Sequence, residues 1–185
     1  MENLQKIFFS IKASFGPQQD PNELQDLIEF LLTKNIKTVL EIGTGFGGSA
    51  FIFLRYFDFV VSIDKYKHIR SGYFHLLDPA RFVFIQEKSA DAKESAEKYL
   101  AGRAVNLLFI DGSHEYNDVK HDFNLYKDLV GPGGYIVFHD IVCSEYTKKH
   151  RCTIYEFWKE IKSSYPFVKE IIKNGKWGGF GVIGI

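Results

Sequence analysis

The sequence predicts an α/β fold with a mostly parallel sheet of seven strands that ends in an antiparallel hairpin. Short apolar runs rich in β-formers alternate with amphipathic helical patterns along the 185 residues. This alternation is typical of a parallel sheet covered by helices on both faces. The last two extended runs are instead joined by a short segment with glycines at 175 and 178, which favours a hairpin.

The first elements are helical. Residues 1–35 form an N-terminal helical segment, amphipathic over 1–15 and broken by Gly16-Pro17. In the second helix Asp20 suits the N-cap, Pro21 the first helical position, and Glu23 the reciprocal side of a capping box. Apolar residues then repeat at helical spacing, which predicts a helix that continues to Asn35.

The remaining elements alternate along the chain. Strands are expected over 38–42, 59–63, 81–86, 105–110, 135–138, 167–172 and 179–185. Helices are expected over 49–56, 91–101, 116–130 and 153–164. No internal repeat or linker divides them, so residues 1–185 are expected to form a single domain.

Composition narrows the functional class. The 23 acidic and 23 basic side chains balance, which argues against a broad nucleic-acid footprint and an electrostatic membrane anchor. No apolar run is long enough to span a bilayer. With no signal peptide visible, Cys143 and Cys152 are expected to be reduced thiols of a cytoplasmic protein. The segment 1–15 could cover a bound substrate or form a contact in a homo-oligomer.

A glycine loop between the first strand and its helix is the first candidate binding site. Its sequence runs from Glu41 through Gly43, Gly45 and Gly47; glycines let the backbone turn tightly and approach a ligand. Asp64 closes the second strand, where a carboxylate can accept both hydroxyls of a ribose. Together they indicate a cofactor that contains adenosine, either NAD or S-adenosylmethionine.

A second candidate site follows strands four and five. Asp111, His114, His139 and Asp140 come directly after these strands, which should be neighbours, so the four side chains should converge. Carboxylates with imidazole suit a divalent cation such as Mg²⁺ or Mn²⁺, although His139 is a less comfortable ligand for Mg²⁺. Alternatively, the two acids could cap helices and the two histidines could bind loop backbone.

The glycine loop resembles motif I of class I S-adenosylmethionine-dependent methyltransferases, where an acid precedes the glycines. The stretch 19–141 is similar to a subgroup with cephalosporin-hydroxylase-like proteins and metal-dependent sugar O-methyltransferases. The resemblance implies a Rossmann-like, doubly wound sheet. The residues that it assigns to the cofactor are Glu41, Gly43, Thr44, Gly45, Ser49, Asp64, Ser89, Ala90, Asp91 and Asp111.

The resemblance also implies a mechanism. Asp111, His139 and Asp140 would hold a divalent metal, and His114 would act with Asp111 in catalysis as the general base, with a pKa near its usual 6.5. Metal-binding members often have Glu at the position of His139. The acceptor would be the hydroxyl of a sugar or secondary metabolite, and the basic loop 142–152 could form a lid over it.

Two other classes remain open from the sequence. An NAD-dependent oxidoreductase shares the glycine loop and the ribose acid, but Glu41 and the terminal hairpin count against it. A protein that binds S-adenosylmethionine without catalysis would show neither turnover nor metal dependence. A nucleic-acid methyltransferase is disfavoured because Asp111-Gly112-Ser113-His114 stands where an Asn/Asp-Pro-Pro-Tyr motif would be.

Overall fold

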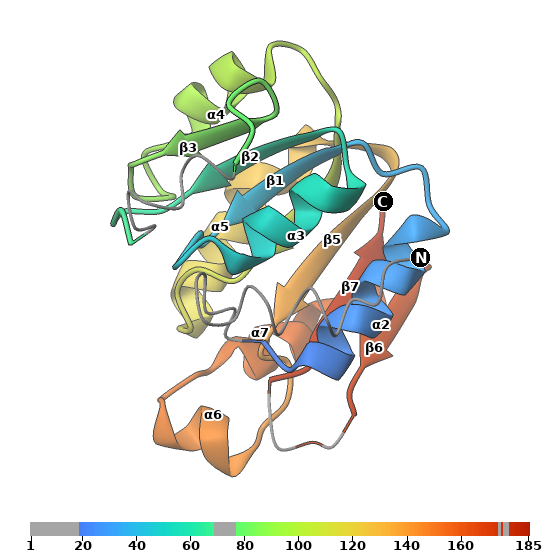
Figure 1. The fold of residues 1–185 in the computed structure, drawn as a ribbon. Helices are drawn as coiled ribbons and strands as arrows, with labels where there is room; N and C mark the ends of the chain where they lie inside the picture. The colour runs from blue at the N-terminus through green and yellow to red at the C-terminus, as the bar shows by residue number, and fades with distance from the viewer. Residues whose placement is uncertain (1–18, 69–76, 174, 176–177) are drawn as a thin grey trace.

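The structure is a computed structural model, and it describes residues 19–68, 77–173, 175 and 178–185 (Figure 1). Its strands are β1 (Thr38–Ile42), β2 (Phe59–Ile63), β3 (Phe82–Ile85), β4 (Val105–Ile110), β5 (Val130–His139), β6 (Val168–Ile171) and β7 (Phe180–Gly184). Its α-helices are α2 (Pro21–Leu32), α3 (Gly48–Tyr56), α4 (Lys93–Leu100), α5 (Tyr116–Tyr126), α6 (Glu145–Lys149) and α7 (Ile154–Ile161). The helix expected over 1–15 lies outside the described residues.

The strands form one seven-stranded sheet in the order β3-β2-β1-β4-β5-β7-β6. Neighbouring strands are parallel through β3-β2-β1-β4-β5, whereas β7 is antiparallel to both of its neighbours, β5 and β6. The predicted fold class is therefore confirmed, including the terminal hairpin. Within the described ranges, no helix is both long and apolar enough to cross a bilayer.

Two apolar layers hold helices against the sheet. One layer joins α2 and α3 to one face, with Leu27, Phe53 and Phe109 fully buried among its members. The other joins α4, α5 and α7 to the opposite face, around Phe138 and Trp158. Strands β1 and β4 alternate their side chains between these layers, and both strands are buried along most of their length.

Helix α2 begins as expected but is tied to the fold differently. The Asp20 carboxylate accepts hydrogen bonds from the backbone N–H groups of Asn22 and Glu23, so it is the N-cap. The expected reciprocal capping bond of Glu23 is absent. Its buried carboxylate instead accepts hydrogen bonds from the N–H of Lys173 (3.0 Å) and of Gly179 (3.2 Å). Tertiary contact between α2 and the β6–β7 hairpin therefore takes precedence over the local motif.

Several expected boundaries of helices and strands shift by a few residues. Helix α2 ends at Leu32 rather than Asn35, and α5 ends at Tyr126 and continues as a 3₁₀ turn over Lys127–Leu129. Strand β5 begins at Val130 rather than at residue 135, because Val105 of β4 pairs with Val130 across a register shift. The pairing of β4 thus draws the glycine-rich stretch before residue 135 into the strand.

The loop expected over 142–152 contains a short helix, α6, which stands apart from the two helical layers (Figure 1). Its N-terminus is a capping box in which the Ser144 hydroxyl accepts a hydrogen bond from Thr147 N–H (3.2 Å). The Thr147 hydroxyl in turn accepts one from Ser144 N–H (2.8 Å). Threonine replaces the usual Glu or Gln at the third position, so the sequence does not match the usual capping-box pattern.

Replacement of Glu23 by Ala should loosen α2 from the hairpin. The change leaves the N–H groups of Lys173 and Gly179 without their acceptor, which should lower the free energy of unfolding by about 1–3 kcal/mol. Glu29→Ala, on an exposed position of the same helix, is the matched control and should change it by less than about 0.5 kcal/mol. Equal losses in urea denaturation would contradict this role of Glu23.

Candidate active site

The glycine loop between β1 and α3 is held against the end of β4. Gly43 has a φ of 95°, and a Cβ atom there would lie 2.1 Å from the Asp111 carbonyl oxygen. The Gly43 N–H donates to the carbonyl of Ile63 (2.9 Å), and the Asp111 N–H donates to that of Ile42 (2.9 Å). Only glycine fits this contact, which brings the loop against the backbone of a candidate catalytic residue.

The buried carboxylate of Glu41 braces this loop from beneath. It accepts hydrogen bonds from the hydroxyls of Ser49, on α3, and Ser62, on β2, and Ser62 also contacts the Thr44 hydroxyl (2.6 Å). Burial raises the pKa of Glu41 to about 7, against the opposing effect of the two serine hydroxyls. Glu41 thus links two strands, the loop and the helix, and lies beneath the cavity rather than in its wall.

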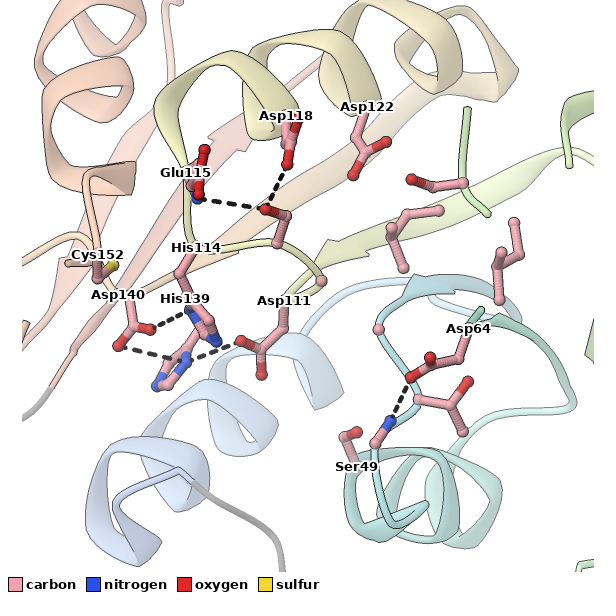
Figure 2. Close-up of a pocket in the computed structure, with 18 of the residues that line it drawn as sticks. Ser49, Asp64, Asp111, His114, Glu115, Asp118, Asp122, His139, Asp140 and Cys152 are labelled. Atoms are coloured by element: carbon pink, nitrogen blue, oxygen red, sulfur yellow. Dashed lines mark hydrogen bonds and ion pairs between the residues drawn. The ribbon is translucent and has the colours of Figure 1, made fainter. Parts of the chain in front are cut away.

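Asp64 lies at the carboxyl end of β2, beside the same loop. One carboxylate oxygen accepts a hydrogen bond from Gly45 N–H (2.9 Å), and the other accepts one from Tyr66 N–H (2.9 Å). Figure 2 shows Asp64 and Ser49 at one end of the pocket and Asp140 and Cys152 at the other, with Asp111 between them. The carboxylate is therefore oriented by backbone and faces the cavity.

One cavity of about 1180 Å³ joins most of the predicted residues. This volume lies just above the range typical of ligand sites, so it leaves room for a nucleoside cofactor together with a second small molecule. The predicted cofactor residues that line it are Gly43, Thr44, Gly45, Ser49, Asp64, Ser89, Ala90 and Asp111, whereas Glu41 and Asp91 do not. Asp91 is an exposed residue whose N–H donates to the carbonyl of Lys88 (2.9 Å).

Buried Asp122 lies on the α5 wall of the cavity and was not predicted as a site residue. Burial raises the pKa of its carboxyl group to about 6, against a hydrogen bond with Ser89. The Tyr126 hydroxyl, one helical turn further on, donates to the Ser89 carbonyl (2.5 Å). Asp122 and Tyr126 therefore fix the Ser89 segment; their spacing on α5 was visible in the sequence, but their contact with Ser89 was not.

The carboxyl ends of β4 and β5 bring Asp111, His114, His139 and Asp140 together, as predicted; we call these four residues the Asp–His cluster. His139 Nδ1 lies 3.0 Å from Asp111 Oδ1 and 3.6 Å from Asp140 Oδ1. His114 Nδ1 lies 2.8 Å from Asp140 Oδ2. Figure 2 shows both imidazoles directed at carboxylates from different strands. The alternative in which the acids only cap helices is therefore wrong.

The cluster alternates charges of opposite sign. The hydrogen bond with Asp140 raises the pKa of His114 to about 10. Burial alone would lower the pKa of His139, but the charges of Asp111 and Asp140 outweigh it and raise the value to about 9. The same contacts lower the pKa of Asp140 despite its burial. His114 is thus an ion-pair partner here, and the expectation of an unperturbed pKa near 6.5 is wrong.

Polar atoms of the cluster are left without partners, and this tests whether the site fits a metal. Asp140 Oδ1, His139 Nε2 and Gln19 Oε1 are buried and have no hydrogen-bond partner among the described residues. Asp111, His139 and Asp140 each offer one ligand atom, and these atoms lie within 4.8 Å of one another. Two carboxylates and one imidazole suit a divalent cation. The residues present therefore fit the expected group.

Two further segments line the cavity with residues that were not predicted as site residues. Gln19, just before α2, donates its Nε2 hydrogen to Asp111 Oδ2 (2.6 Å). Cys152 lies beside His114 and Asp140. Tyr146, His150 and Arg151 reach the wall from α6 and the residues after it. Gln19 is separated from β1 by the whole of α2, and the sequence pointed to residues 146–152 only through the expected basic lid over 142–152.

The comparisons agree with this geometry. The model of a family described as a methyltransferase domain matches residues 40–141, more than half of the chain, and the chain belongs to that family. An uncharacterized protein of Acanthamoeba polyphaga mimivirus is 58% identical over 36 residues, which are 20% of this chain. The chain matches only part of its curated relatives: the match covers 16% of the mimivirus protein and 8% of a second relative, an uncharacterized protein of Sinorhizobium fredii.

Solved structures share the fold across nearly the whole chain. An O-methyltransferase from Bacillus cereus in complex with SAH aligns with a TM-score of 0.72 at 17% identity, covering 98% of this chain and 90% of that one. MycE methyltransferase from the mycinamycin biosynthetic pathway, in complex with Mg, SAH and mycinamycin VI, aligns at 0.64 and 18% identity, covering 98% and 53%. At these identities the likeness concerns the fold.

The fold and the family define an S-adenosylmethionine-dependent methyltransferase of class I. The sheet order, with its antiparallel β7 beside β5, and the family match at the glycine loop both favour this class. The sheet order and the family match therefore decide against an NAD-dependent oxidoreductase, the class of enzyme that the glycine loop and Asp64 alone had left open.

A substitution at Gly43 should be more damaging than the backbone conformation alone explains. Gly43→Ala adds a Cβ that collides with the Asp111 carbonyl, whereas Gly102→Ala, at a φ of 79°, meets nothing within 4 Å. Both changes carry the strain of positive φ, about 1–3 kcal/mol, and overpacking should add about 1–3 kcal/mol at Gly43 alone. Denaturation of the two variants measures the difference, and equal losses would refute the close contact.

The pKa of Glu41 predicts a pH dependence of stability. Because the folded state raises this pKa from 4.5 to about 7, the folded protein binds the proton more tightly, and Glu41 lowers stability progressively as pH rises from 4.5 to about 7. The full difference is of the order of 3 kcal/mol. Glu41→Gln should therefore gain stability relative to the wild type between about pH 5 and about pH 8.

Urea denaturation of Glu41→Gln and of the wild type at about pH 5 and about pH 8 measures this gain in stability. Glu94→Gln, at an exposed position of α4, is the control for loss of one carboxylate. If the stability of Glu41→Gln relative to the wild type were the same at both pH values, the raised pKa of Glu41 would be refuted.

Proposed function

We propose that the protein transfers a methyl group from S-adenosylmethionine to a hydroxyl of a small-molecule acceptor, assisted by a divalent cation. The observation that carries the proposal is the position of Asp111. Its backbone contacts Gly43 of the cofactor loop, and its carboxylate contacts His139 of the Asp–His cluster. A hydroxyl at this cluster would therefore lie beside the methyl group of a cofactor held by the glycine loop.

Positioning should supply much of the rate. Methyl transfer needs an oxygen in line with the bond from sulfur to methyl, and a well-oriented pair of reactants has a large entropic advantage. The glycine loop, Asp64 and Ser89 would hold the cofactor, because they line one end of the cavity. The residues of α6 would enclose the other end, where the acceptor binds.

The acceptor hydroxyl must also lose its proton. Asp111, His139 and Asp140 would hold the divalent cation, which when bound would lower the pKa of a coordinated hydroxyl. His114 would take the proton at Nε2, because its Nδ1 lies 2.8 Å from Asp140 Oδ2 and donates to that carboxylate. This role requires that the bound cation neutralise the carboxylate of Asp140, because the hydrogen bond that His114 donates to Asp140 is the main cause of the raised pKa of His114.

A sugar or a secondary metabolite with adjacent hydroxyls is the proposed acceptor. Two adjacent hydroxyls can chelate a cation held by carboxylates, and the cavity has room for a cofactor and such a molecule. The resemblance to sugar O-methyltransferases supports this class, and mycinamycin VI is present in the MycE complex.

Calorimetric titration of S-adenosylmethionine, with and without Mg²⁺, tests the proposal. The wild type should bind the cofactor and give a separate Mg²⁺ signal. Asp140→Asn should weaken Mg²⁺ at least tenfold and leave cofactor affinity unchanged, since Asn tolerates the backbone φ of 63° at this position. Asp128→Asn, exposed and outside the cavity, should retain both signals.

Two other outcomes would change the proposal. Cofactor binding without any Mg²⁺ response would remove the metal from the proposal, and His114 could then accept the proton only at alkaline pH, because Asp140 raises its pKa to about 10. Absence of cofactor binding in the folded wild type would contradict the proposed roles of the glycine loop and Asp64.

A further inference from the structure

Cys152 forms part of a group of possible metal ligands that the proposed mechanism does not use. It follows α6 and precedes α7, and its side chain is only 3% exposed. The backbone N–H of Cys152 donates a hydrogen bond to the carbonyl of Thr147 (2.8 Å). This bond turns the chain after α6 back toward the end of β5. Cys143, by contrast, is exposed.

The thiol lies among groups that bind metals. The Cys152 side chain lies close to both His114 and Asp140. The three residues each offer one ligand atom, and these atoms all lie within 4.8 Å of one another. We call His114, Asp140 and Cys152 the thiol cluster. Its members come from three segments, after β4, after β5 and after α6, so only the fold brings them together.

Backbone contacts hold this geometry in place. Thr153, next to Cys152, donates its N–H to the His114 carbonyl (2.8 Å), and its hydroxyl accepts a hydrogen bond from Tyr116 N–H (2.8 Å). The loop of His114 is therefore tied directly to the loop of Cys152. A site with ligands already in place needs little reorganisation when an ion binds.

Asp140 supplies a second sign of a ligand site. The residue is 3% exposed, and its Oδ1 has no hydrogen-bond partner among the described residues. A buried carboxylate oxygen without a partner is unfavourable. Oδ2 faces the thiol cluster, 2.8 Å from His114 Nδ1, whereas Oδ1 lies 3.6 Å from His139 Nδ1. A cation at the thiol cluster would therefore satisfy Oδ1 only by binding both oxygens of this carboxylate.

We propose that the thiol cluster is a binding site for a thiophilic divalent cation such as Zn²⁺. Thiolate, imidazole and carboxylate are the ligands that Zn²⁺ takes in tetrahedral sites, and three protein ligands leave a fourth position for water or a small ligand. The side chain of His114 is 46% exposed, so the ion has a route in from solvent. On binding, Cys152 and His114 release their protons to solvent.

This site and the proposed Mg²⁺ site exclude each other. Both need Asp140, and Zn²⁺ at the thiol cluster would also bind His114, the proposed proton acceptor. Zn²⁺ would therefore inhibit methyl transfer in competition with Mg²⁺. This consequence rests on the proposed function, whereas binding of Zn²⁺ itself does not.

Direct metal binding tests the site without an activity assay. Reduced protein is titrated with Zn²⁺ against a chromophoric chelator, and with Co²⁺, whose thiolate complexes have a charge-transfer absorption band. The wild type should bind Zn²⁺ and show this band. Cys152→Ser should lose the band and bind Zn²⁺ at least tenfold more weakly, while Cys143→Ser, the matched control, should retain both.

Two more variants separate the site from folding and from the Mg²⁺ proposal. His114→Ala changes a partly exposed side chain and should also weaken Zn²⁺ at least tenfold. His139→Gln, which removes a ligand of the Mg²⁺ site only, should retain the cobalt band. Absence of the band in the wild type, its persistence in Cys152→Ser, or its loss in Cys143→Ser would overturn the proposal, whatever the cofactor titration shows.

Discussion

Strand β4 pairs in parallel with β1 on one side and with β5 on the other, and the geometry of the site depends on this pairing. The carboxyl ends of all three strands lie at one edge of the sheet. The residue after β4, Asp111, therefore stands between the glycine loop after β1 and the His139–Asp140 pair at the end of β5. Without this order, a cofactor site and a proton-transfer site would have no residue in common.

Buried charge is the second constraint on the site. Asp140 and His139 are almost wholly buried, and each would be unfavourable alone. Two carboxylates and two imidazoles arranged with alternating charge reduce this penalty, and they shift the pKa values of both histidines upward. The same arrangement leaves Asp140 Oδ1 unpartnered. The cluster is thus compensated in charge but incomplete in hydrogen bonds, as expected of groups that bind a ligand.

Two segments outside the parallel sheet complete the cavity. Helix α2 is attached through Glu23 to the β6–β7 hairpin and brings Gln19 to Asp111. The α6 segment closes on itself through its capping box and brings Cys152 to Asp140. Both depend on polar contacts between segments far apart in sequence. The strand ends supply Asp111, His139 and Asp140, and these two segments add Gln19 and Cys152 beside them.

The sequence by itself determined the strands, their alternation with helices and the terminal hairpin, because apolar periodicity and glycine placement are local properties. It also placed the glycine loop, Asp64 and the Asp–His cluster at strand ends, since parallel strands must end at one edge. The tertiary structure alone decided the partner of Glu23, the raised pKa of His114, and the meeting of Gln19 and Cys152 with the cluster. Those features depend on which distant groups share a buried space, and no local pattern encodes that.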